Sequence, residues 1–125
     1  MLVKTYCAAV NGLEVTTVTI EVSVSRGVMY HLTGLADTAV KESHDRIVAA
    51  LQNNGFKFPV ADITINMAPA DLRKEGSAYD LPLAIGILAA TGKMNADRLS
   101  QYMLVGELGL DGRIQPVRGA LPIAI

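Results

Sequence analysis

The segment from Asp80 to Ala90, DLPLAIGILAA, constrains the fold of this chain more than any other. Pro82 is compatible with a helix only in the first turn, where its missing N–H group has no intrahelical partner, and Gly92 is a suitable stop. Asp80 is predicted to cap the free N-terminal amides. Apolar residues lie on every side of this helix: Leu81, Leu83, Ala84, Ile85, Ile87, Leu88 and Ala89. A helix without a polar face must be buried in a core.

Strand patterns occupy much of the remaining chain. LVKTYCAAV and LEVTTVTIEVSVS are rich in β-branched residues and flank Asn11-Gly12, which predicts a hairpin with a type I′ turn. VMYHLTGL and ADITINM predict a third and a fourth strand. MLVGELGL and RIQPV flank Asp111-Gly112 and predict a second hairpin.

Two further helices are expected. One apolar stripe has helical spacing between Asp37, whose residue type suits an N-cap, and the stop at Gly55. It consists of Val40, His44, Ile47, Val48 and Leu51. A short polar helix is expected near 96–102. The order βββ-α-β-α-ββ predicts the α+β class, an α/β two-layer sandwich with a mixed sheet packed by helices.

Composition predicts one domain over residues 1–125, because the chain has the length of an ordinary domain and half of its residues are hydrophobic. A formal charge of −1 gives no strong positive field for autonomous nucleic-acid binding. The single cysteine, Cys7, favours a reducing, cytoplasmic setting, and the longest apolar run is about half of a membrane span. The chain ends in GALPIAI without a polar cap, so we expect a domain excised from a longer protein.

Neither a nucleotide site nor a metal site is predicted within the chain. A phosphate loop requires GxxxxGK[ST], but the spacing from Gly86 to Gly92-Lys93 is one residue too long and Met94 replaces the hydroxyl. Lys93 instead suits a helix C-terminus. A magnesium cluster can be drawn from the hard oxygen ligands of Asp71, Glu75 and Asp80. Asp80 is better explained as a helix cap, and Arg73 and Lys74 neutralise the other two.

Three single residues have structural explanations. His44 is expected to pack on the apolar stripe of its helix, and Cys7 to be a small core side chain. Glu107 lies alone in an apolar strand, so it requires a partner. Arg113 or Arg118 across the second hairpin is the expected partner.

Two segments carry a resemblance to a peptidase. KEGSAYDLPLAIGILAATG followed by VGELGLDGRIQPVRGALPIAI resembles the proteolytic domain of Lon. Matching the Lon Gly-Pro-Ser-Ala-Gly segment to Gly76 and the residues after it sets Ala78 at the nucleophile position. Matching the hairpin sets Leu121 where Lon has its lysine. The resemblance therefore implies the fold without the catalytic pair, and a relocated Ser77/Lys74 pair is the peptidase alternative.

A closer resemblance covers nearly the whole chain. GLADTAVKESHDRIVAALQNNGFKFP, ITINMAPADLRKEGSAYDLPLAIGILAATG and GELGLDGRIQPVRGALP resemble the N-terminal domain of the magnesium-chelatase-like AAA+ ATPases, the ComM or YifB family. The resemblance implies the fold of the second domain of ribosomal protein S five, shared with Lon. It also implies a C-terminal AAA+ module that binds ATP and Mg²⁺, a hexameric ring and, for ComM, a DNA helicase that drives branch migration.

The resulting hypothesis is a non-catalytic accessory domain that helps an attached ATPase ring to assemble or to engage DNA. The alternatives are the Ser77/Lys74 peptidase and a free-standing RNA-binding module. Because the loop before the Asp80 helix lies at the positive end of the helix dipole, we also expect Arg73, Lys74 and Tyr79 to form an anion-facing or partner-facing surface.

Overall fold

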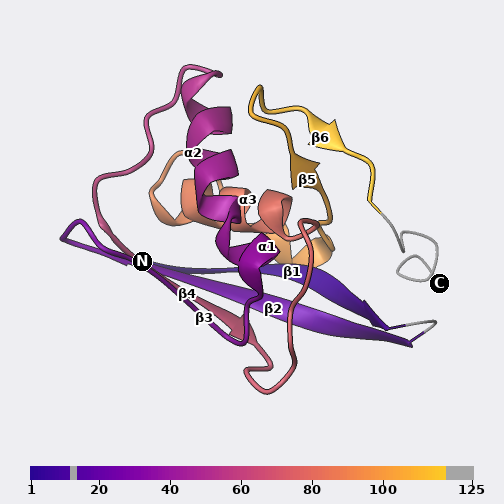
Figure 1. Cartoon of the computed structure of the whole chain (residues 1–125). Helices are drawn as coiled ribbons and strands as arrows, with labels where there is room; N and C mark the ends of the chain where they lie inside the picture. Colours follow the sequence, from indigo (N-terminus) through magenta and orange to yellow (C-terminus); the bar gives the residue numbers. More distant parts are fainter. Residues whose placement is uncertain (12–13, 118–125) are drawn as a thin grey trace.

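The computed structural model describes residues 1–11 and 14–117. They form two layers, with a four-stranded sheet beneath helices that all lie on one of its faces (Figure 1). The elements of the sheet are β1 (Leu2–Asn11), β2 (Glu14–Ser25), β3 (Tyr30–Thr33) and β4 (Asp62–Ala68). The predicted α+β class with a mixed sheet packed by helices is confirmed. The predicted Asn11-Gly12 turn lies outside the described residues.

The sheet has the order β1-β2-β4-β3, in which only β3 and β4 are parallel. Two short helices, α1 (Thr38–Lys41) and α2 (Ser43–Gln52), connect these parallel neighbours. They replace the single helix that was expected, because the chain is interrupted at Glu42. Asp37 is the predicted cap of α1, and its Oδ1 accepts a 2.8 Å hydrogen bond from the Val40 amide.

Alternation along the strands separates the two faces of the sheet. The inner side chains of β2 and β4 are buried, namely Val18, Ile20, Val22, Ile63, Ile65 and Met67. The outer face carries a polar row, where Asn66 donates to Glu21 at 2.9 Å and Thr33 donates to Asn66 at 3.1 Å. One face of the sheet therefore builds the core, while the other has the polar character of a solvent-facing antiparallel sheet.

The third helix, α3 (Asp80–Ala90), lies across β1 and β2 as the apolar pattern predicts. A Cβ atom added to Gly86 would lie 2.8 Å from Val22, so this glycine allows the helix to approach the sheet closely. The Thr5 hydroxyl donates to the carbonyl of Pro82 at 3.0 Å. At the C-terminal end, Gly92 has a φ angle of +76°, which confirms it as the stop.

The remaining elements are short. The helix expected near 96–102 is only a 3-10 turn, η1 (Leu99–Gln101), and the second hairpin is confirmed as β5 (Glu107–Leu108) with β6 (Ile114–Gln115). The β5–β6 hairpin forms its own two-stranded sheet beside α2 and α3. Across the ranges 1–11 and 14–117, no helix is long and apolar enough to cross a membrane.

Candidate functional site: the segment before helix α3

The segment from Leu72 to Tyr79 is held in place on two sides. The Lys74 amide donates to the carbonyl of Leu35 at 3.0 Å, and its carbonyl accepts from the Asp37 amide at the same distance. Near the other end, the Ala78 carbonyl accepts a 2.9 Å bond from Gly106. Backbone hydrogen bonds to two other parts of the chain therefore anchor this segment.

Two clefts flank this segment, and Glu75 lines both. The Tyr79 cleft has a volume of about 310 Å³ and is lined by Ala9, Val10, Leu72, Arg73, Glu75 and Tyr79. The Ser77 cleft has a volume of about 360 Å³ and is lined by Glu75, Gly76, Ser77, Ala78, Glu107, Pro116 and Val117. Ala78, which the resemblance to Lon sets at the nucleophile position, lines the Ser77 cleft and has only a methyl side chain.

Glu107 has a different partner from the one expected. The Ser77 hydroxyl donates to Glu107 Oε1. Arg113 instead lies 3.5 Å from Asp111, with both side chains exposed, and Arg118 lies outside the described residues. The Arg113 prediction is wrong because the hairpin turns that side chain toward its own loop.

Lys74 is not available as a base for Ser77. Its side chain is 0% exposed, and its ammonium donates to the carbonyl of Pro69 in the same loop. Burial lowers the pKa of Lys74, and the nearby Asp71 carboxylate opposes that change. Ser77 and Lys74 each bind another group, which disfavours a catalytic pair.

Replacing Lys74 with methionine is expected to leave the free energy of unfolding near neutral pH unchanged or slightly higher. The apolar side chain keeps the packing and removes a buried charge, while the Pro69 carbonyl still accepts from the Leu72 amide at 3.3 Å. Because burial lowers the pKa in the folded state, the unfolded state binds more protons, and wild-type stability should rise with pH toward the ordinary lysine range. Urea unfolding at several pH values should show this rise in the wild type and a smaller one in Lys74→Met. A large loss of stability in the variant would show instead that the ammonium is required.

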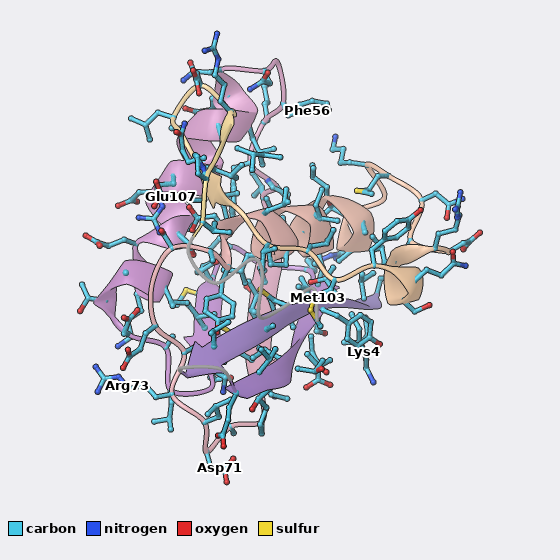
Figure 2. All side chains as sticks on the ribbon, turned by 90° about the vertical axis from the view of Figure 1, so that its right-hand side faces the viewer. Lys4, Phe56, Asp71, Arg73, Met103 and Glu107 are labelled. Atoms are coloured by element: carbon cyan, nitrogen blue, oxygen red, sulfur yellow. The ribbon has the colours of Figure 1, made fainter. Side chains whose placement is uncertain are left out.

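The expected surface of Arg73, Lys74 and Tyr79 is not formed. Tyr79 is 3% exposed and Lys74 is fully buried, because both side chains turn inward from the loop. Arg73 alone projects outward, with Asp71 on the same loop (Figure 2), and it pairs with Glu75 at 3.0 Å. Arg73 and Tyr79 nevertheless line one cleft.

Asp80 does not cap α3, and this prediction is also wrong. The N-cap position belongs to Tyr79, which makes no side-chain cap bond. Arg46 on α2 binds the Asp80 carboxylate through two hydrogen bonds of 2.6 and 2.9 Å. The same carboxylate accepts a 3.1 Å bond from the Leu108 amide on β5. Asp80 therefore joins α2, α3 and β5. Its hydrogen bonds with the Arg46 guanidinium are the main reason why the pKa of Arg46 is raised.

The three carboxylates considered as magnesium ligands are separately engaged. Asp80 binds Arg46, Glu75 pairs with Arg73, and Asp71 is exposed at the loop. Within residues 1–11 and 14–117, no three His, Cys, Asp or Glu side chains are grouped so as to hold a metal ion.

His44 and Cys7 have the packing roles expected of them. The His44 ring lies 4.4 Å from that of Tyr30 and 5.1 Å from that of Phe58, centroid to centroid. Cys7 is fully buried, and burial raises the pKa of its thiol to about 12. The thiol is therefore protonated and unreactive near neutral pH.

Comparison with known proteins agrees with the resemblance seen in the sequence. A family model described as subunit ChlI of Mg-chelatase matches residues 20–125. The chain is 46% identical over 114 residues to the protein YifB of Escherichia coli strain K12, covering 90% of this chain and 22% of that protein. It is 48% identical over 118 residues to competence protein ComM of Haemophilus influenzae, covering 94% of this chain and 23% of that protein. The chain thus spans less than a quarter of these two relatives.

Proposed function

This chain belongs to the family described as subunit ChlI of Mg-chelatase, and we propose that it is a non-catalytic accessory domain of a longer ATPase. In this proposal a C-terminal AAA+ module of the same polypeptide binds ATP and Mg²⁺, and the protein assembles as a homo-oligomeric ring in the cytoplasm. The accessory domain supports assembly of the ring or its engagement of DNA. The greater length of the relatives supports the attached module, and the name of one relative, competence protein ComM, supports a connection to DNA.

The contacts of Ser77 carry the non-catalytic part of the proposal. An active serine requires a base that accepts its proton and becomes a general acid in turn. The only group bonded to the Ser77 hydroxyl among the described residues is the Glu107 carboxylate. A carboxylate is a weak base for a hydroxyl near neutral pH unless its pKa is raised. The ammonium of Lys74, the other candidate, is bonded to Pro69.

Deletion and labelling experiments test the proposal in the full-length protein. Without residues 1–125, the ATPase module is expected to keep basal ATP hydrolysis, while ring assembly or DNA-stimulated hydrolysis falls. These properties are measured by analytical ultracentrifugation and by steady-state ATPase assays. A serine-directed fluorophosphonate is expected to leave the 125-residue chain unlabelled.

Two results would contradict this function. Labelling that disappears in Ser77→Ala would support the peptidase alternative. Wild-type ring assembly and wild-type DNA stimulation in the deleted protein would show that the domain supports neither process.

A further inference from the structure

The side chain of Tyr79 is almost fully buried beside the Tyr79 cleft. Tyr79 is 3% exposed, and none of the side-chain hydrogen bonds among the described residues involves its hydroxyl. The side chain lines the Tyr79 cleft. Burial raises the pKa of the Tyr79 phenol, and the nearby Cys7, Asp37 and Glu75 raise it further. The hydroxyl is therefore protonated near neutral pH and can donate a hydrogen bond to a ligand.

The rest of the lining suits a neutral ligand with both donors and acceptors. Arg73 Nε lies 3.0 Å from Glu75 Oε1, and the two side chains are 70% and 66% exposed. A free anion such as phosphate would meet the Glu75 carboxylate, and a free cation would meet the Arg73 guanidinium. The backbone of a peptide ligand carries no net charge, and its C=O and N–H groups can bind Arg73 and Glu75, respectively. Apolar walls from Ala9, Val10 and Leu72 leave space for an apolar side chain.

Ala9 and Val10, which line the cleft, belong to β1, the edge strand of the sheet. Met1 and Val24 exchange two 3.0 Å backbone bonds, so the odd-numbered residues of β1 bond to β2. The backbone N–H and C=O groups of the even-numbered residues then point away from β2. The carbonyl of Tyr6 is an example, because it accepts a 2.7 Å hydrogen bond from the Leu104 amide. The backbone N–H and C=O groups of Val10 also point away from β2, and no described residue forms a hydrogen bond with them. This part of the edge can pair with another extended chain.

We propose that the Tyr79 cleft binds an extended, uncharged peptide segment of a partner polypeptide, which adds to the β1 edge at Val10 and places an apolar side chain against Leu72. Strand addition gives affinity through backbone bonds and selectivity through side-chain pockets. In the complex the Tyr79 hydroxyl donates to a carbonyl of the bound segment. The inference deepens the proposed function and rests on it for the biological context, because it makes the partner of this cleft a protein and not DNA.

Titration of the ¹⁵N-labelled 125-residue chain with a capped peptide, acetyl-Thr-Val-Leu-Val-Thr-amide, tests the inference by NMR. Amide signals of Val10, Arg73, Glu75 and Tyr79 are expected to shift together. Tyr79→Phe should weaken binding about fivefold, which corresponds to one net hydrogen bond, while its thermal midpoint stays unchanged because the hydroxyl has no internal partner. Tyr102→Phe is the matched control. That hydroxyl bonds to Arg98 outside the cleft, and the variant should bind like the wild type.

Two further probes separate strand addition from other ways of binding. Two peptides, each N-methylated on one of the two sets of alternate amides, should differ in affinity, because only the amides that face β1 take part in strand pairing. Inorganic phosphate and a single-stranded oligonucleotide should leave the cleft signals unmoved. Equal binding by wild type and Tyr79→Phe, equal binding of the two methylated peptides, or shifts of the same amides with phosphate would overturn the inference. So would the absence of shifts at millimolar peptide. If the peptide does not bind but deletion of residues 1–125 abolishes ring assembly, the inference about the cleft fails and the accessory function stands. The failure of one proposal is therefore distinguishable from the failure of the other.

Discussion

Replacing Arg46 with alanine is expected to lower the free energy of unfolding by about 3–5 kcal/mol, the range for breaking one side of a buried ion pair. Asp80 is 0% exposed, and Arg46 supplies both of its charged hydrogen bonds. The variant would leave the carboxylate buried with the Leu108 amide as its only donor among the described residues. It would also remove the 2.7 Å bond from Arg46 to the Ala39 carbonyl.

Urea unfolding followed by circular dichroism measures this change, and the hairpin pair of Arg113 and Asp111 provides the control. Those side chains are 85% and 62% exposed and 3.5 Å apart, so Arg113→Ala should change stability by less than about 0.5 kcal/mol. Similar losses in the two arginine variants would contradict the importance assigned to the buried pair. A double replacement, Arg46→Met with Asp80→Leu, should recover much of the lost stability because no charge remains buried.

Replacing Gly34 with alanine is expected to destabilise the fold by about 3 kcal/mol, the upper range for one strained residue. Its φ angle is +107°, a conformation that disfavours any side chain. An added Cβ would lie 2.3 Å from the carbonyl oxygen and 2.9 Å from the amide nitrogen of Met67. Both atoms belong to the β4 backbone, which cannot move without disturbing the pairing of β4 with β2 and β3.

Gly55→Ala separates the two causes of this loss. Gly55 has a φ angle of +84°, but an added Cβ would have no neighbouring atom within 4 Å. It should therefore lose only about 1–2 kcal/mol, from the backbone conformation alone. Thermal and chemical unfolding of both variants measure the difference, which reports on the close approach to Met67. Equal losses would mean that β4 relaxes around the methyl group.

The backbone architecture follows from local sequence patterns because each pattern reports on burial. An apolar run with no polar face must form a buried helix, and α3 does so. Alternating β-branched residues form β1 and β2 for the same reason. The break at Glu42 was missed because the apolar stripe continues on both sides of it, and the stripe carries no information about a change of helix axis.

The site was predicted less well because its contacts join residues that are distant in the chain. The capping rule considers only amides adjacent to Asp80, whereas the actual partner, Arg46, lies 34 positions away. A carboxylate at the start of a wholly apolar helix was a usable signal that a buried cation exists elsewhere. Lys74 was assigned to the surface because charge runs are usually solvated, yet the chain tethers that loop to Leu35 and Asp37 and turns the lysine inward. Ser77 and Glu107, 30 positions apart, meet for the same non-local reason.

The hydrogen bonds around Asp80 also limit which substitutions the fold can tolerate during evolution. The Asp80 carboxylate at the start of α3 is bonded to α2 and to β5, so one side chain links three segments that are far apart in the sequence. A descendant that loses Arg46 or Asp80 alone passes through a poorly folded intermediate, while loss of both together does not. We therefore expect Arg46 and Asp80 to be kept or replaced together, and the contact between α2, α3 and β5 to be kept with them.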